Sequence, residues 1–196
     1  MKLIDNATDI RIPKGSVVIM TGLQGAGKTF FTEIFFDKEN VICNDKIFWE
    51  QFKKSGKKDM IAQEDYQDIY DRACDVVFKK IEKYSKEKSY TVIDSIVYSF
   101  EGRMNCLRKM KKMFSNIILI VINPEFDTVY KQFQERESAV RNSKEQVGIT
   151  MPDWMMMFAN KYVLDEQIKN GLIGYKTDIT YIVRDMDNVK VSIETK

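Results

Sequence analysis

The sequence predicts an α/β domain in which a mainly parallel, five-stranded sheet lies between two layers of helices. Short runs that are apolar at every position recur along the chain, and amphipathic helical patterns separate them. Strands that are apolar at every position are covered on both faces, as in a parallel sheet. Right-handed crossovers would then give a three-layer α/β/α sandwich with its functional site at the carboxyl ends of the strands. The 196 residues fit a single domain, 1–196, whose core needs no disulfide or structural metal.

Five segments carry the pattern of a buried strand: Val17–Met20, Val41–Cys43, Thr91–Ile93, Ile117–Ile122 and Ile179–Val183. Before the first of them, the residues up to Gly15 predict a turn with a short edge hairpin. After the last, Val189–Ile193 alternates apolar and polar residues behind the turn-like Asp187-Asn188, which predicts an edge strand that closes the sheet.

Helical periodicity fills the gaps between these strands. Three amphipathic stripes stand out: Ile69, Ala73, Val77 and Ile81; Phe126, Val129, Tyr130 and Phe133; and Phe31, Ile34 and Phe35. Apolar residues that recur three or four positions apart predict helices that bury one face.

Composition excludes several classes of function. The chain has no histidine, so an imidazole base, a histidine metal ligand and a Ser-His-Asp triad are all excluded. Cys43, Cys74 and Cys106 lack the paired spacing of a zinc site or disulfide framework and are expected to be small buried thiols. A net charge of +2 is too small to demand a nucleic-acid partner. No apolar run spans a bilayer and the N-terminus carries an early acid, so we expect a cytoplasmic protein.

A glycine-rich loop follows the first buried strand. Its eight residues are Gly22, Leu23, Gln24, Gly25, Ala26, Gly27, Lys28 and Thr29. They match the pattern Gly-x-x-x-x-Gly-Lys-[Ser/Thr] between a strand and an amphipathic helix, the context that a phosphate-binding loop (P-loop) needs. The backbone N–H groups would face the phosphates of ATP or GTP, Lys28 would reach the β- and γ-phosphates, and the Thr29 hydroxyl would hold Mg²⁺.

The remaining strand ends narrow the class of P-loop protein. Strand 90–94 ends in Asp94 and is followed by Ser95, whereas hydrolytic P-loop proteins carry Asp-Glu at this place. GTPases carry a guanine-reading segment after the fourth strand, and here Asn123-Pro124 stands instead. A small kinase that transfers phosphate to a bound acceptor is therefore favoured.

The chain resembles the 5′-hydroxyl polynucleotide kinases and their P-loop relatives over most of its length. Besides the P-loop, the resemblance rests on strand ends and helix positions: Cys43-Asn44-Asp45, Val92-Ile93-Asp94-Ser95, Asn123-Pro124, Glu135-Arg136 with Arg141, and Pro152 with Met155, Phe158 and Tyr162. The resemblance implies a P-loop fold with a helical lid over about residues 134–155, and ATP and Mg²⁺ as cofactors.

Roles follow from the resemblance for four residues. Asp45 would take the proton of the acceptor hydroxyl; its alternative is to cap a helix that starts near Ile47. Arg136 and Arg141 would close over the triphosphate, or else they are solvated helix residues. Asp94 would orient the acceptor or reach Mg²⁺ through water, and a turn or cap role is its alternative.

The chain departs from the family pattern on the acceptor side. Phe48 stands where the family commonly has an arginine three residues after the catalytic Asp, and Lys46 would substitute only as a point charge. Asp94-Ser95-Ile96-Val97 stands where the family usually has Asp-x-Thr-Asn. Phe48, Trp49 and Phe52 could stack bases or pack into the core.

The leading hypothesis is an ATP- and Mg²⁺-dependent kinase that phosphorylates the 5′-hydroxyl of a polynucleotide. One alternative is a kinase of the same fold acting on a small molecule, including the toxin-like kinases of nucleotide-sugars. Another is a module that binds ATP without transferring phosphate. The sequence leaves the acceptor, the choice of ATP over GTP and the oligomeric state open.

Overall fold

The computed structural model describes residues 2–56, 63–94, 100–142, 154–172 and 176–194. Its strands are β1 (Lys2–Ile4), β2 (Asp9–Ile12), β3 (Ser16–Gly22), β4 (Val41–Cys43), β5 (Tyr90–Asp94), β6 (Asn116–Ile122), β7 (Ile179–Val183) and β8 (Lys190–Ile193). Its helices are α1 (Lys28–Phe35), α2 (Asn44–Lys54), α3 (Gln63–Glu87), α4 (Phe100–Met110), α5 (Phe126–Asn142) and α6 (Trp154–Lys169), with a 3-10 turn, η1 (Lys38–Asn40), before β4.

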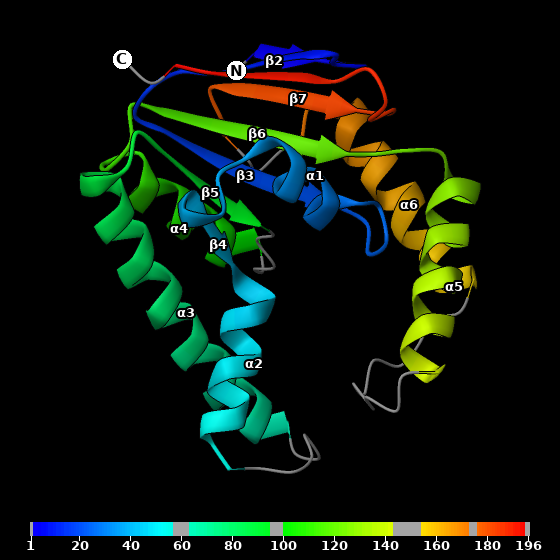
Figure 1. Ribbon diagram of the computed structural model, residues 1–196, viewed down its shortest axis with the longest axis horizontal. Helices are drawn as coiled ribbons and strands as arrows, with labels where there is room; N and C mark the ends of the chain where they lie inside the picture. The colour runs from blue at the N-terminus through cyan, green and yellow to red at the C-terminus, as the bar shows by residue number, and fades with distance from the viewer. Residues whose placement is uncertain (1, 57–62, 95–99, 143–153, 173–175, 195–196) are drawn as a thin grey trace.

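Six strands form the main sheet, in the order β1-β7-β6-β3-β5-β4. Every pairing between them is parallel. The five predicted strands all lie in this sheet, and β1 adds a sixth at the edge beside β7. Because all strands run the same way, their carboxyl ends meet along one edge of the sheet (Figure 1).

Two predictions about the chain ends were wrong. The first residues form no hairpin: β1 joins the main sheet, whereas β2 pairs with β8 in a separate two-stranded parallel sheet. For the same reason β8 does not close the main sheet. Every second residue of β2 points inward: Ile10 and Ile12 are completely buried. They pack in the core cluster on one face of the main sheet and so hold the small sheet against it.

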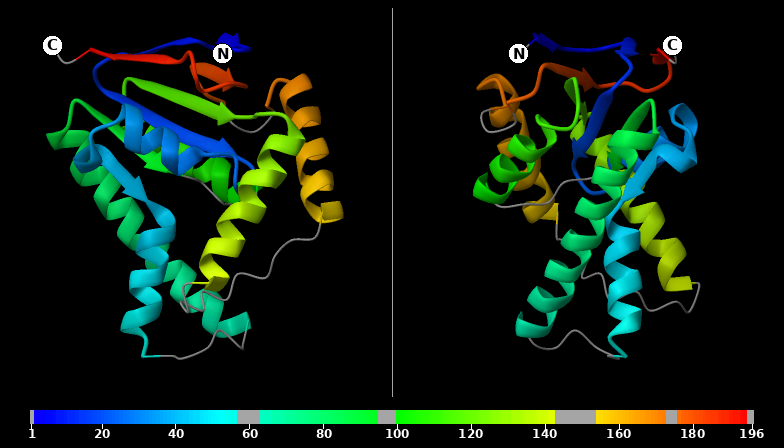
Figure 2. Two further views of the ribbon diagram at one scale, coloured as in Figure 1. Left: turned by 45° about the vertical axis from the view of Figure 1, so that its right-hand side comes forward. Right: turned by 90° about the vertical axis from the view of Figure 1, so that its left-hand side faces the viewer.

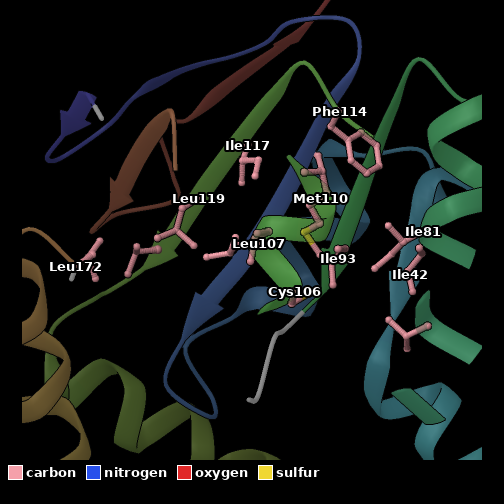
Figure 3. Close-up of a cluster of buried hydrophobic side chains, with 14 of the residues drawn as sticks. Ile42, Ile81, Ile93, Cys106, Leu107, Met110, Phe114, Ile117, Leu119 and Leu172 are labelled. Atoms are coloured by element: carbon pink, nitrogen blue, oxygen red, sulfur yellow. The ribbon is translucent and has the colours of Figure 1, made fainter. Parts of the chain in front are cut away.

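The core lies in two clusters, one on each face of the main sheet. Strand residues alternate between them, as a pleated strand requires: Val17 and Ile19 belong to one cluster, and Val18 and Met20 to the other. The first cluster is completed from α2, α3 and α4, and Figure 3 shows part of it around Ile93 and Leu107. The second receives Phe31 of α1 and Phe133 of α5. The three-layer prediction is therefore confirmed, as the turned views in Figure 2 show.

The predicted helical stripes are confirmed for α3 and in part for the others. Ile69, Ala73, Val77 and Ile81 are all buried. On α1, Phe31 is buried but Ile34 is 55% exposed, so its predicted place in the core was wrong. Phe30 and Ile34, four residues apart, form an outer face of this two-turn helix. Within the described residues, no helix is both long and apolar enough to cross a membrane.

Candidate nucleotide-binding site

The strand order brings the chemically important segments together at the carboxyl edge. β3 lies between β5 and β6, and its last residue, Gly22, is in register with Ile122. On the other side of β5 lies β4, and its last residue, Cys43, is in register with Asp94 at the end of β5. The P-loop is therefore flanked by the residue that ends β5 and by Asn123, which follows β6.

Glycine is required at both ends of the P-loop. Gly22 has a φ of 143°, and a Cβ there would lie 2.3 Å from the carbonyl oxygen of Ile122. Gly27 occupies the left-handed region at the N-cap of α1, with a φ of 88°, and a Cβ there would lie 2.7 Å from the Cε of Met186. The loop is thus built by close backbone approach, which leaves its inner surface to N–H and C=O groups.

Lys28 is the first residue of α1, and its ammonium lies over the loop. Its Nζ donates hydrogen bonds to the carbonyl oxygens of Gly22 at 3.0 Å and Leu23 at 2.8 Å. No side chain hydrogen-bonds the N-cap of this helix. The positive end of the helix and a lysine therefore meet at the loop, which is the arrangement that attracts phosphate.

Asp94 faces the second functional side chain of α1. The Thr29 hydroxyl lies 3.4 Å from Oδ2 of Asp94 and can donate to it. Asp94 is 6% exposed. Burial raises the pKa of this carboxyl, the nearby positive charge of Lys28 opposes the rise, and the negative charge of Asp45 adds to it. The two residues predicted to serve Mg²⁺, Thr29 and Asp94, are thus brought together.

Asp45 lies in the first turn of α2, directly beyond the end of β4. It does not cap the helix, since α2 begins at Asn44 and its N-cap is Cys43, so the predicted N-cap alternative was wrong. Its carboxylate is exposed, and its charge acts on both Asp94 and the half-buried Cys43. Burial raises the pKa of the Cys43 thiol, and the negative charges of Asp94 and Asp45 raise it further. An exposed carboxylate beside the P-loop is free to approach an acceptor hydroxyl.

The two predicted arginines lie on α5, which runs from Phe126 to Asn142. The backbone of Arg136 and Arg141 is helical there, but their side chains lie outside the part of the chain that the structure describes. Of the predicted lid, 134–142 belongs to α5, 143–153 lies outside the described residues, and α6 begins at Trp154.

A polar cluster that the sequence did not predict lies beside the end of β6. Asn123 is 2% exposed, and its Nδ2 donates to Asp165 of α6 at 2.9 Å. Lys161 donates to both oxygens of Asp165, at 2.8 and 2.7 Å. Burial would raise the pKa of Asp165, but the hydrogen bonds from Lys161 and Asn123 outweigh it and lower the pKa. The spacing of Lys161 and Asp165 along one helix was the only local signal of this cluster in the sequence. Nothing local indicated that Asn123, which follows β6, is a partner of Asp165.

A second ion pair fixes the adjacent strand end. Arg184, directly after β7, donates to both carboxylate oxygens of Asp5 at 2.9 and 3.0 Å. Hydrogen bonding to Arg184 lowers the pKa of Asp5. This bidentate pair joins the ends of β1 and β7. Arg184 lies two residues before Met186, whose Cε lies close to Gly27 of the P-loop.

The residues present fit a nucleoside triphosphate with Mg²⁺. Three features of this structure support the fit: a loop path at Gly22 and Gly27 that leaves no room for a Cβ, the Lys28 ammonium at the loop, and the contact of Thr29 with Asp94. Mg²⁺ in such sites takes few protein ligands and completes its shell with phosphates and water. Thr29 would hold the ion and Asp94 would hold its water. Among the described residues, no group of three acidic or cysteine side chains could bind a metal.

Comparison with known proteins shows the fold. No family model matches the sequence, and no curated protein matches it. A protein from Chloroflexus aurantiacus, described provisionally as a kinase, aligns with a TM-score of 0.59 at 10% identity, over 87% of this chain and 88% of that one.

Two other solved structures are similar. A chain of the Pnkp1/Rnl/Hen1 RNA repair complex gives a TM-score of 0.58 at 17% identity, over 81% of this chain and 46% of that one. A chain of the PezAT chromosomal toxin-antitoxin system of Streptococcus pneumoniae gives 0.56 at 16% identity, over 90% and 70%. At these identities the likeness shows the fold alone, and the chain shares its α/β fold with these structures.

Proposed function

We propose that this protein is an ATP- and Mg²⁺-dependent kinase that transfers the γ-phosphate to a hydroxyl acceptor, with the 5′-hydroxyl of a polynucleotide as the acceptor. The observation that carries the proposal is the meeting of a P-loop with an exposed carboxylate, Asp45, at the same edge of the sheet. The P-loop is suited to the donor phosphates, and the Asp45 carboxylate is suited to an acceptor hydroxyl.

The donor half rests on the loop. Phosphoryl transfer passes through a loose transition state, so positioning and charge neutralisation contribute most of the catalysis. The Lys28 ammonium and the N-terminus of α1 supply positive charge at the loop. Bound Mg²⁺ would neutralise further charge on the phosphates. Arg136 and Arg141, on the helix that follows Asn123, would add guanidinium groups.

The acceptor half rests on Asp45. The oxygen of the acceptor hydroxyl would bond to the γ-phosphorus as the bond from that phosphorus to the bridging oxygen breaks, and ADP would leave. The hydroxyl proton would pass to the Asp45 carboxylate, which needs only hydrogen-bond reach and an ionised state at neutral pH. The likeness of fold to a chain of an RNA repair complex agrees with a polynucleotide acceptor.

Transfer of labelled phosphate tests the proposal. The protein is incubated with γ-labelled ATP, Mg²⁺ and 5′-hydroxyl DNA or RNA oligonucleotides. Parallel reactions contain nucleosides, nucleoside monophosphates, sugars or nucleotide-sugars. We expect label on the oligonucleotides, and its loss in Asp45→Asn while ATP binding persists, because Asp45 would act on the acceptor alone. Label on small molecules alone would overturn the polynucleotide acceptor.

Asp45→Asn has a matched control in Asp9→Asn. Asp9 is an exposed carboxylate on β2, outside the site, and its loss should leave transfer unchanged. If Asp45→Asn transferred phosphate as fast as the Asp9→Asn protein, the role of Asp45 as base would be wrong.

A small-molecule kinase is the second candidate, and one observation favours it. Phe48 occupies the position three residues after Asp45, so no guanidinium stands there to hold the phosphate of a polynucleotide. The likeness of fold to a chain of a toxin-antitoxin system fits a toxin-like kinase of nucleotide-sugars equally well. The same panel separates the two acceptors. Tight ATP binding without transfer to any of them would instead indicate a non-catalytic nucleotide-binding module.

A further inference from the structure

Helix α2 carries an aromatic group, Phe48, Trp49 and Phe52, that the proposed chemistry does not use. Phe48 and Trp49 meet edge to face with ring centroids 5.7 Å apart, and Trp49 and Phe52 do so at 5.5 Å. Phe48 also meets Tyr66 of α3 at 5.3 Å. We call the outward pair, Trp49 and Phe52, the aromatic face of α2.

The aromatic face lies on the side of α2 that carries Asp45. Trp49 and Phe52 are four and seven residues after Asp45, and such positions share one face of a helix. At about 1.5 Å per residue, Trp49 stands about 6 Å and Phe52 about 10 Å along the helix from Asp45. Since α2 extends away from the carboxyl edge of the sheet (Figure 1), these rings continue outward from the acceptor site.

The packing of α2 shows that the aromatic face is not its core side. Ile47 is the buried residue of this helix, and it packs in the cluster shared with α3. Phe48 packs against the same cluster from the flank. Trp49 and Phe52 belong to neither core cluster and remain half-buried. Large aromatic rings that are only half-buried at a helix surface are suited to stacking.

Charge along α2 favours a nucleic-acid occupant. Lys53 and Lys54, both exposed, lie at the end of the helix that is far from Asp45, directly beyond Phe52. Aromatic rings on which bases stack, beside lysines that contact the backbone, are the features of single-strand binding surfaces. A phosphate chain that ran from Asp45 along the helix would reach these lysines after passing the rings.

We infer that the aromatic face stacks the first bases of a single-stranded acceptor, so that its terminal 5′-hydroxyl is held at Asp45 and its following phosphates meet Lys53 and Lys54. This inference rests on the proposed function. It makes the enzyme selective for unpaired 5′ ends, because a base inside a duplex stacks on its neighbours and has no free face for Trp49.

Kinetics of transfer test the aromatic face. Trp49→Leu and Phe52→Leu should each raise the KM for a single-stranded 5′-hydroxyl oligonucleotide by about 5- to 100-fold, the effect of losing one base–aromatic stack, with kcat nearly unchanged. An oligonucleotide without its first two bases should have a similarly high KM in the wild type and should not be affected by Trp49→Leu. Tyr162→Leu, which removes a 61%-exposed aromatic residue of α6, is the matched control and should leave KM unchanged.

A binding measurement separates stacking from folding defects. The chain has two tryptophans, so Trp154→Phe leaves Trp49 as the only one, and single-stranded DNA should quench its fluorescence. Transfer to oligonucleotides with the same KM in wild type, Trp49→Leu and Phe52→Leu would overturn the inference while leaving the proposed function intact. Quenching by nucleotide-sugars but not by DNA, with no transfer to DNA, would overturn both.

Discussion

Lys161→Met should destabilise the protein, because it removes the cation that pairs with Asp165, the residue to which Asn123 at the end of β6 donates. The Lys161 side chain is 10% exposed and pairs with Asp165, which is 35% exposed. Removing one partner of a fully buried pair costs about 3–5 kcal/mol. Water reaches Asp165 and Asn123 still donates to it, so we expect a smaller loss, about 2 kcal/mol. For a chain of this size that corresponds to a fall in Tm of about 4–8 °C.

Urea unfolding at pH 7, followed by circular dichroism, measures this loss. The matched control is Lys169→Met, on the same helix, whose pair with Glu166 is 2.7 Å long but has side chains 70% and 39% exposed. Exposed pairs contribute little, so this variant should unfold at the urea concentration of the wild type. If Lys161→Met lost no more stability than Lys169→Met, the proposed contribution of the buried pair would be refuted.

The acid limb of the stability curve provides a second measure of the same contact. The pKa of Asp165 is lowered in the folded protein, so this carboxyl contributes stability above its unfolded pKa of about 3.9. That contribution is lost as the pH falls from there through the folded pKa. Lys161→Met removes the main cause of the lowering, and the difference in stability between wild type and variant should therefore shrink below about pH 4. A difference that stayed constant down to pH 2 would contradict this assignment.

Three further substitutions test the P-loop. Gly22→Ala places a Cβ against the Ile122 carbonyl oxygen. We expect the free energy of unfolding, measured in urea, to fall by about 1–3 kcal/mol, and calorimetry to show weaker ATP binding. Lys28→Met should slow phosphate transfer by about 100- to 1000-fold with an unchanged circular dichroism spectrum. Phe133→Ala removes a fully buried ring of α5, the helix whose backbone lies against Gly25 of the P-loop; we expect a loss of about 3–5 kcal/mol in the free energy of unfolding and, because the support of the loop is loosened, a raised Kd for ATP. Wild-type values in any of the three would contradict the reasoning for that position.

Periodicity predicted the elements that bury a single stripe. In α3 the residues Ile69, Ala73, Val77 and Ile81 recur every four positions over three turns of the helix, so the pattern indicates one buried side, and the structure confirms it. In α1 the apolar residues Phe30, Phe31, Ile34 and Phe35 lie at positions i, i+1, i+4 and i+5 and form one broad face. The period shows which side of the helix is apolar but not which part of that side meets the core, and only packing decides that Phe31 is buried while Ile34 is exposed.

The polar contacts near the site could not be predicted from the sequence. Lys161 and Asp165 are four residues apart on one helix, a spacing that any sequence shows. Their link to Asn123 joins residues 42 apart in the chain. Arg184 and Asp5 are 179 residues apart. Such contacts depend on which strands are neighbours, and a single sequence carries no local signal of that order.

The P-loop could be predicted from the sequence because its physics is local. Eight consecutive residues between a strand and a helix contain the glycines that permit the backbone path, together with Lys28 and Thr29. What faces that loop depends on the sheet. Asp94 meets Thr29 because β5 pairs with β3, and the charge of Asp45 acts on Asp94 because β4 pairs with β5. The order β6-β3-β5-β4 results from side chains that pack across long chain separations, so the tertiary structure alone placed the Asp45 carboxylate at the same edge of the sheet as the P-loop.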